Sequence, residues 1–113
     1  MYKYYVKPIR VVDGDTIDVM VDLGFNVSKK VRVRLLGIDA PELRTKDLDE
    51  KKKGREAKAF TTVLLTQNNE ETEVILESTK IDSFGRSLGY IYINGKDLGE
   101  ILIKNGYAKE YKR

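Results

Sequence analysis

Two runs of alternating apolar residues in the first forty positions restrict the fold of this chain more than any other feature. Every second residue is apolar from Ile17 to Val21, and again from Val31 to Leu35. Successive side chains of a strand point to opposite faces, so this period of two predicts two half-buried strands. Turn residues over 23–26 separate them, and a strand over roughly 4–12 completes a predicted three-stranded meander.

The rest of the chain predicts two helices and two further strands. Residues 44–53 are densely charged and are predicted to form a surface loop. A helix is predicted to begin at Gly54, because apolar residues recur at three- and four-residue steps from Ala57 to Leu64, and to end near 67–69. The other predicted elements are strands over 72–76 and 88–93, turns over 82–85 and 94–95, and a short helix over about 98–105 capped by Gly106.

This order of elements predicts the fold class. Three strands, a helix, two strands and a helix match the OB-fold, a five-stranded, partly open barrel that commonly binds oligonucleotides. We therefore expect a β-barrel with helices, with one helix between strands 3 and 4 and a short C-terminal helix. With 113 residues, the chain is expected to form a single domain over 1–113. A generic α+β domain could show the same order, so the pattern alone leaves that alternative open.

The absence of two residue types narrows the chemistry. The chain has no cysteine, which excludes disulfides, a thiolate nucleophile and thiolate zinc sites. It also has no histidine, the usual general base and a common ligand of transition metals. A bound metal must therefore be held by oxygen, which favours Ca²⁺, Mg²⁺ or Mn²⁺. Acid–base chemistry falls to Asp, Glu, Lys or Tyr.

Charge and hydropathy set weaker limits. The net charge of +3 is compatible with a polyanionic partner, but equally with an ordinary, mildly basic protein. No apolar run approaches the ~18 residues that a membrane span needs, so no membrane partner is expected. The N-terminus lacks an apolar segment of signal-peptide length, which predicts a cytoplasmic location for the chain as given. Secretion of a trimmed form stays open.

Three short segments carry the argument for a function. Asp13 and Asp15 flank a glycine, so their carboxylates can point at one cation, although a plain turn has the same sequence. Asp39 and Glu42 follow the strand that ends near 35, and the intervening proline favours an extended backbone there. An ordinary polar loop would read the same way. Residues 82–86 form a turn that ends in Arg86, which alone indicates no more than a turn.

Taken together, these segments suit the cleavage of phosphodiesters. A cation at the carboxylates can polarise a phosphoryl oxygen. Two arginines, Arg34 on the polar face of its strand and Arg86, can hold the other phosphate oxygens with their guanidinium forks. A nearby carboxylate can then orient or deprotonate the attacking water.

The same segments resemble the staphylococcal nuclease (thermonuclease) family. The matching stretches are 12–16, 34–42, 54–60 and 82–92, in the same order and spacing, and the similarity runs from about Tyr4 to Tyr111. The resemblance implies an OB-type barrel with a Ca²⁺ site. It also implies hydrolysis of DNA and RNA, with single strands preferred, to products with a 3′-phosphate and a 5′-hydroxyl. No protein partner is inferred.

The resemblance also implies which residues bind the metal. By position, Asp15 and Asp39 resemble the Ca²⁺-ligating carboxylates, and the backbone carbonyl of Ala40 resembles a further ligand. Asp13 matches an acidic neighbour of the metal site. The family's type member has threonine in place of Ala40, a change that keeps the backbone ligand and removes a hydroxyl.

Further roles follow from the same resemblance. Glu42 matches the general base or water-orienting residue, and Arg34 and Arg86 match the arginines that bind the scissile phosphate. Phe84 and Tyr111 lie where the family contacts the substrate. Because Phe84 replaces a tyrosine, one hydroxyl that could bind phosphate is missing, and we expect weaker nucleotide affinity.

Two other functions remain open at this point. One is an OB-fold module that binds single-stranded nucleic acid without cutting it, as inactive repeats of this family do. Such a module needs stacking aromatic residues and a basic groove, but it has no use for carboxylates that repel phosphate. The other is a purely structural domain, which would bind neither metal nor phosphate.

Overall fold

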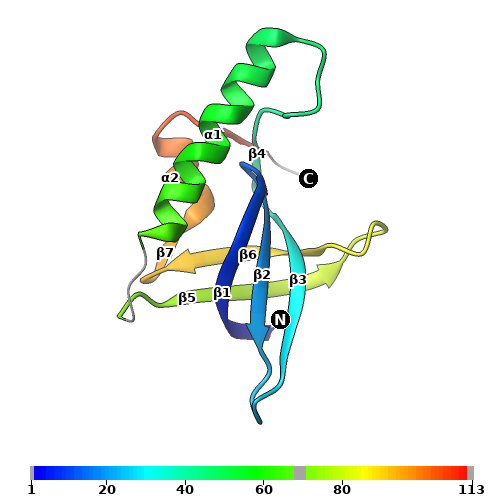
Figure 1. The fold of residues 1–113 in the computed structure, drawn as a ribbon, viewed down its shortest axis with the longest axis vertical. Helices are drawn as coiled ribbons and strands as arrows, with labels where there is room; N and C mark the ends of the chain where they lie inside the picture. Colours follow the sequence, from blue (N-terminus) through cyan, green and yellow to red (C-terminus); the bar gives the residue numbers. More distant parts are fainter. Residues whose placement is uncertain (1, 68–70, 112–113) are drawn as a thin grey trace.

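The computed structural model describes residues 2–67 and 71–111, and it forms a five-stranded barrel with two helices at one end (Figure 1). Five strands of seven or more residues build the barrel: β1 (Tyr2–Asp13), β2 (Thr16–Asp22), β3 (Ser28–Leu35), β5 (Val74–Ile81) and β6 (Ser87–Ile93). They lie in the order β3-β2-β1-β5-β6, and a β3–β6 pairing closes the sheet. The predicted OB-type fold class is confirmed.

The strand pairing explains how so short a chain closes a barrel. The meander of β1, β2 and β3 is antiparallel, as predicted, and β3 pairs in parallel with β6 over only three residues. β1 pairs with β5 through its first residues and with β2 through the rest. Its register shifts around Ile9 and Val12 mark bulges, which bend a strand and increase its twist.

The alternating residues of the sequence form the barrel core. Ile17, Val19 and Val33 are fully buried, whereas the residues between them face the other side of the sheet. Removal of this apolar surface from water is the main favourable contribution to folding. The other fully or almost fully buried large residues are Leu35, Leu76, Leu88, Ile91, Leu98 and Leu102.

The first helix begins six residues earlier than the sequence pattern predicted. α1 runs over Leu48–Thr66, so the prediction of a loop over 44–53 is wrong for its second half. The carboxylate of Asp47 caps the helix by accepting from the backbone N–H groups of Asp49 and Glu50, 3.0 and 3.3 Å away. The three lysines that follow are good helix formers and extend into solvent. The predicted end is confirmed at Gln67, the C-cap, and 68–69 lie outside the described residues.

The second helix agrees with the prediction. α2 spans Leu98–Lys104, and Gly106 ends it with a φ of 80°. The N–H groups of Gly106 and Tyr107 donate to the carbonyls of Ile103 and Leu102, which is the Schellman arrangement. The predicted strand over 72–76 is displaced, because β5 begins at Val74 and continues to Ile81.

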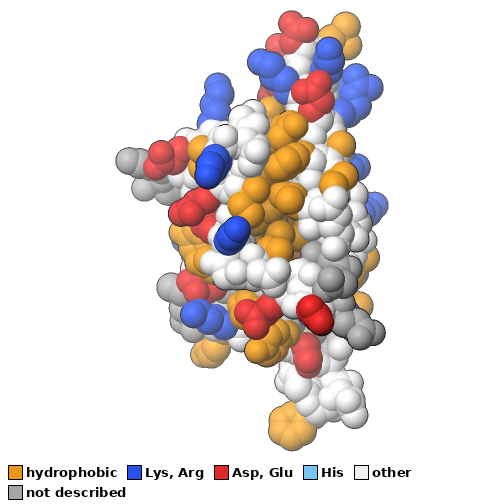
Figure 2. Space-filling model, turned by 90° about the vertical axis from the view of Figure 1, so that its left-hand side faces the viewer, with side chains coloured by type: hydrophobic (Ala, Val, Ile, Leu, Met, Phe, Trp, Pro, Cys, Tyr) orange, Lys and Arg blue, Asp and Glu red, His pale blue; other side chains and the backbone are white. Residues whose placement is uncertain are grey.

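Three two-residue strands were not predicted, because segments this short have no readable period. β4 (Ile38–Asp39) pairs with β8 (Lys109–Glu110), and β7 (Lys96–Asp97) extends the sheet beside β6. Viewed from the side of α1 and α2, apolar side chains form a band between scattered charged residues (Figure 2). Among the described residues, no helix combines the length and the apolar character needed to cross a bilayer.

Candidate active site

The carboxylate of Asp15 links the β1–β2 turn to the end of β4 by a hydrogen bond. It lies in the turn between β1 and β2 and is buried. Its Oδ2 accepts a hydrogen bond of 3.0 Å from the backbone N–H of Ala40, just after β4, and its Oδ1 accepts one of 3.1 Å from the Thr16 hydroxyl. This fixes the carboxylate in one orientation next to Asp39 and Ala40.

Arg34 lies between the two carboxylates that the resemblance assigns to the metal. It is the β3 residue paired with Thr16, so it projects from the outward face of the barrel. Its Nη2 is 3.4 Å from Asp15 Oδ2 and 3.7 Å from Asp39 Oδ1. Its Nη1 donates to the carbonyls of Leu35 and Ile38. The structure thus brings Asp15 of the β1–β2 turn, Arg34 of β3, and Asp39 and Ala40 at the end of β4 together.

The donor set at this point fits a hard cation. Asp15 is held in place, whereas the side chain of Asp39 is 61% exposed and free to turn toward a ligand. Two carboxylates and the carbonyl of Ala40 supply oxygen, which Ca²⁺ and Mg²⁺ prefer. No group of three acidic, histidine or cysteine side chains gathers anywhere in 2–67 and 71–111. The remaining ligands of such a cation would therefore be water or substrate phosphate.

Asp13 and Glu42 lie farther from this contact network. Asp13 ends β1 opposite Thr16 and is half-buried. The pKa of Arg32 is raised mainly by its hydrogen bond to Asp18, and the charge of Asp13 adds a smaller effect in the same direction. Glu42 lies on the loop that follows β4, and its side chain is exposed. Within the part of the chain that the structure describes, the Glu42 carboxylate makes no hydrogen bond or ion pair.

Arg86 and Phe84 form a separate cluster on the β5–β6 turn. Both Nε and Nη2 of Arg86 lie 2.8 Å from Asp82 Oδ2, and the guanidinium is 5.5 Å from the centre of the Phe84 ring. Burial raises the pKa of Asp82, but the hydrogen bonds from Arg86 and Phe84 more than offset it, so the pKa is lowered. Ser87 pairs with Val33, so Arg86 lies beside β3 without contacting Arg34 or Asp15.

Tyr111 lies close to the same end of the barrel as Asp39. Lys109 pairs with Asp39 in the β4–β8 ladder, and the N–H of Tyr111 donates to the carbonyl of Gly37 at 2.9 Å. The ring is about half exposed. A hollow of about 500 Å³ beside it is lined by Asp39, Ala40 and Lys109 among others.

Helix α1 positions the site through contacts that sequence reasoning missed. A Cβ on Gly14 would come within 3.0 Å of the Cβ atoms of both Ala40 and Ala57. A Cβ on Gly54 would lie 2.8 Å from the carbonyl oxygen of Glu42. The helix therefore packs directly on both loops that carry the carboxylates. The signal for this contact is the pair of small residues, Gly54 and Ala57, three apart on one helix face.

A second ion pair near the site was also missed. Asp18 is only 2% exposed, and it accepts from Arg32 Nε at 2.8 Å and Nη2 at 3.2 Å. The hydrogen bond from Arg32 lowers the pKa of Asp18 despite its burial. The two residues are direct partners in the β2–β3 ladder. The sequence signal for this ion pair is an acidic residue at an outward position of one strand and an arginine directly opposite it on the next strand.

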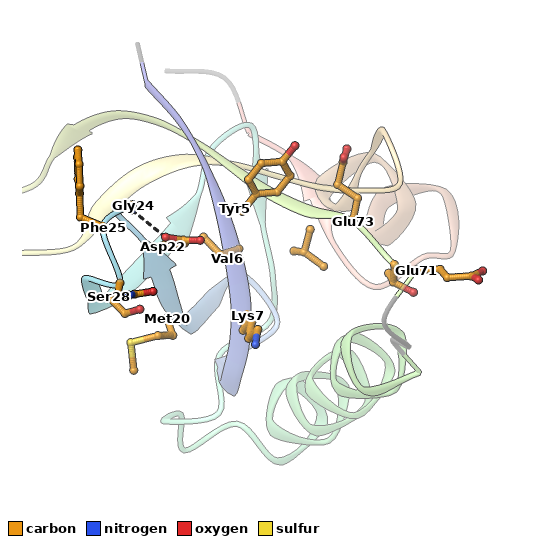
Figure 3. A pocket seen from close by; sticks show the side chains of 13 residues that line it. Tyr5, Val6, Lys7, Met20, Asp22, Gly24, Phe25, Ser28, Glu71 and Glu73 are labelled. Atoms are coloured by element: carbon orange, nitrogen blue, oxygen red, sulfur yellow. Dashed lines mark hydrogen bonds between the residues drawn. The ribbon is translucent and has the colours of Figure 1, made fainter.

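A larger hollow lies at the other end of the barrel. It is lined by Tyr5, Met20, Phe25 and Glu73, among others (Figure 3). None of the residues predicted for the active site lines it. Phe25 is fully exposed at the tip of the β2–β3 hairpin, where its φ of 55° places it in a tight turn.

Comparison with known proteins gives the same family as the sequence motifs. The model of the family described as staphylococcal nuclease homologue matches residues 32–113. A thermonuclease of Staphylococcus hyicus is 34% identical over 103 residues, which are 91% of this chain and 57% of that protein. The endonuclease YncB of Bacillus subtilis is 32% identical over 88% of this chain and 44% of its own length. An uncharacterised protein of Bacillus anthracis is 37% identical over 90% of this chain and 45% of its own length. The chain spans about half the length of these relatives.

Proposed function

The chain belongs to the family of staphylococcal nuclease homologues, and on that premise we propose that it is a Ca²⁺-dependent nuclease. Its substrates are DNA and RNA, with single strands preferred. The observation that carries the proposal is the position of Arg34, between the carboxylates of Asp15 and Asp39. An arginine fork and two carboxylates at one point can bind a phosphate and a cation together.

Each group has a defined task in this proposal. Asp15, Asp39 and the carbonyl of Ala40 would hold Ca²⁺, and the bound ion would supply a positive centre that polarises a phosphoryl oxygen. Arg34 turns its fork from the carboxylates to the phosphate and stabilises the charge that develops in the transition state. When Arg34 turns, it leaves ion-pair contacts with the two carboxylates that are longer than ordinary hydrogen bonds, and it also gives up the hydrogen bonds that Nη1 donates to the carbonyls of Leu35 and Ile38.

Bond cleavage follows from in-line attack by water. Glu42, whose exposed carboxylate lies on the loop that follows β4, accepts a proton from the water as the water oxygen forms a bond to phosphorus. The bond from phosphorus to the 5′ oxygen breaks, and that oxygen takes up a proton. The products carry a 3′-phosphate and a 5′-hydroxyl. Arg86 contributes its fork after releasing Asp82, and Phe84 and Tyr111 provide aromatic surface for bases.

Two relatives support the activity through their names, as a thermonuclease and an endonuclease. Since this chain matches only about half of each, the activity of the chain itself needs a direct test. The substrate would be single-stranded DNA or RNA, incubated with Ca²⁺ or with a chelator. We expect cutting that requires Ca²⁺ and stops on chelation, and products that a phosphatase acting on 3′-phosphates can trim.

A matched pair of variants makes this test specific. Asp39→Asn removes a carboxylate of the proposed site and should abolish activation by Ca²⁺. Asp22→Asn removes an exposed carboxylate of β2 at the far end of the strand and should leave activation unchanged. The same Ca²⁺ titration in wild type and Asp39→Asn would refute the metal assignment. Binding that weakens with salt, without any cutting, would instead support the non-cleaving OB-fold module.

A further inference from the structure

The outward face of the meander carries a regular array of charged residues. The strands β1, β2 and β3 lie side by side (Figure 1), and their pairing places their outward residues in three rows. The rows are Asp13–Thr16–Arg34 at the proposed active site, then Arg10–Asp18–Arg32, then Lys7–Met20–Lys30 toward the hairpin. We call the last two rows the basic rows.

The basic rows present positive charge to solvent. Arg10, Lys7 and Lys30 are exposed, and within the described residues none of them forms an ion pair. Their single carboxylate, Asp18, is buried and occupied by Arg32. The first row differs, because Asp13 lies there and Asp15 lies beside it. Net positive charge therefore begins one row away from the proposed metal site.

Arg32 is held in a fixed position with donors to spare. Asp18 accepts from its Nε and Nη2, yet the Arg32 side chain is 46% exposed. Arginine has five N–H donors, and within the described residues Nη1 makes no hydrogen bond. A guanidinium that is already oriented loses less side-chain freedom when it binds a phosphate. Asp18 is thus a positioning residue for Arg32.

The spacing of the cations suits a polynucleotide. Arg34, Arg32 and Lys30 are alternate residues of β3, so they follow one another at about 6.6–6.8 Å along the strand. This is close to the distance between neighbouring phosphates of an extended single strand. β6 pairs with β3 only from Val33 to Leu35, which leaves the other edge of β3 open beside Arg32 and Lys30.

Exposed apolar side chains favour an unpaired strand over a duplex. Met20 lies between Lys7 and Lys30, and Phe84 is 83% exposed on the turn beside β3. Unpaired bases can stack on such side chains, whereas a duplex keeps its base faces hidden. Lys7 and Met20 of the last basic row also line the hollow of Figure 3, and the acidic residues Asp22 and Glu73 of that hollow mark the end of the positively charged surface.

We propose that the basic rows bind the phosphates that flank the scissile phosphate of a single-stranded substrate, with the strand running from Arg34 toward the β2–β3 hairpin. This inference rests on the proposed function, because Arg34 marks the position of the scissile phosphate. It adds a substrate-binding surface of about two further phosphates, held by Arg32 and Arg10 in one row and by Lys30 and Lys7 in the next.

The test measures binding in the absence of cleavage. Fluorescence anisotropy with labelled dT12 and dT2 is recorded in chelator, over a range of salt concentrations. The variant is Arg10→Ala/Lys30→Ala, since neither side chain makes an ion pair whose loss would disturb folding. The control is Lys96→Ala/Lys104→Ala, which removes the same charge from exposed positions on β7 and α2. Circular dichroism checks that each protein is folded.

The double variant is expected to lose affinity for the long oligonucleotide but not for the short one. For dT12, the dissociation constant of the variant should rise by about tenfold or more, and the slope of log K against log salt should fall by about 1.4, or 0.7 for each of two phosphates. For dT2, and for the control with either ligand, changes should stay within about twofold. Equal losses in variant and control, an unchanged slope, or no dT12 binding by wild type would overturn the inference.

The inference and the proposed function fail in different ways. If wild type does not cut but the length-dependent loss is seen, the binding surface stands and the nuclease does not. If wild type cuts in a Ca²⁺-dependent manner but the variant binds dT12 normally, the nuclease stands and the binding surface is wrong.

Discussion

Arg32 and Arg34 lie two residues apart on β3, and their contacts with carboxylates differ in distance, number of partners and burial. Asp18 and Arg32 form a short two-point contact, with distances of 2.8 and 3.2 Å. Arg34 instead divides itself between Asp15 and Asp39 at 3.4 and 3.7 Å, and gives its other nitrogen to backbone carbonyls. Asp18 and Arg32 hydrogen-bond to each other within the protein, whereas the contacts of Arg34 with Asp15 and Asp39 are too long to be ordinary hydrogen bonds.

The difference separates a contact that stabilises the fold from one that can do chemistry. A catalytic group must exchange partners when substrate arrives. Arg34 would leave two long ion-pair contacts, whereas Arg86 would first have to release Asp82, which lies 2.8 Å away. A buried carboxylate such as Asp18 has the opposite requirement, because an unpaired charge there would be costly. Arg32 should therefore matter mainly to stability and affinity, and Arg34 mainly to turnover.

The largest effect is expected at Arg34. Arg34→Lys keeps the positive charge but removes the fork that holds two phosphate oxygens. Turnover at saturating substrate should fall by about 10³–10⁵-fold, the range for arginines that stabilise phosphoryl transfer. The measurement is the initial rate of oligonucleotide cleavage in Ca²⁺. The matched control is Arg32→Lys, which should keep its rate at saturation within about tenfold.

For stability we expect the opposite order, with a larger loss on substitution of Arg32 than of Arg34. Arg32→Ala leaves Asp18 buried without its partner, and should lower the free energy of unfolding by about 1–3 kcal/mol, discounted for the partial exposure of Arg32. Arg34→Ala should cost less, since its ion-pair contacts are longer. Urea unfolding of Asp18→Ala, Arg32→Ala and the double variant should give a coupling energy of about 1–2 kcal/mol. Zero coupling would mean that the pair contributes nothing.

The same comparison has a pH dependence. The hydrogen bond from Arg32 lowers the pKa of Asp18 below its ordinary 3.8, against the opposing effect of burial. A carboxylate with a lowered pKa in the folded state stabilises the protein fully above the ordinary pKa. This contribution is lost as the pH falls through the lowered value. The stability difference between wild type and Asp18→Asn should therefore shrink below about pH 4.

Asp22→Asn serves as the control for this titration. Asp22 is on the same strand but is exposed and caps a turn, where Asn can accept the same hydrogen bond from Gly24. Its stability difference from wild type should be small at every pH. If Asp18→Asn showed the same flat profile, the special character of the Asp18–Arg32 pair would be disproved.

The features that depend on the periodicity of apolar residues were predicted from the sequence, whereas contacts between distant segments were missed. The alternating runs from Ile17 to Val21 and from Val31 to Leu35 located two strands. The family resemblance located Asp15, Arg34, Asp39 and Ala40, which the structure brings together. Their roles stay predictions. The small residues Gly54 and Ala57 indicate a helix face open to close contact, but nothing periodic in the sequence says that the Glu42 loop is the segment that packs there.

The first residue of α1 was predicted wrongly for a different reason, because the sequence does contain a signal for a helix N-terminus there. Asp47 followed by Glu50 has the spacing of a capping box, and the lysines between 51 and 53 favour a helix. The high charge of this stretch suggested a loop. High charge excludes burial but not helix formation, and the first turns of α1 indeed lie in solvent.

The smallest effect is expected at Asp47, the N-cap of α1. Its carboxylate caps a helix and takes part neither in the proposed catalysis nor, among the described residues, in an ion pair, so it extends the comparison between stabilising and catalytic carboxylates. Asp47→Ala removes the acceptor for the N–H groups of Asp49 and Glu50, and should lower the free energy of unfolding by about 1 kcal/mol. Asp47→Asn keeps that acceptor and should cost less. Both are measured by urea unfolding alongside the cleavage rate, which should stay near that of wild type. A large loss of rate would show that the first turn of α1 helps to hold the Glu42 loop, so that the separation between stabilising and catalytic carboxylates would not extend to this helix.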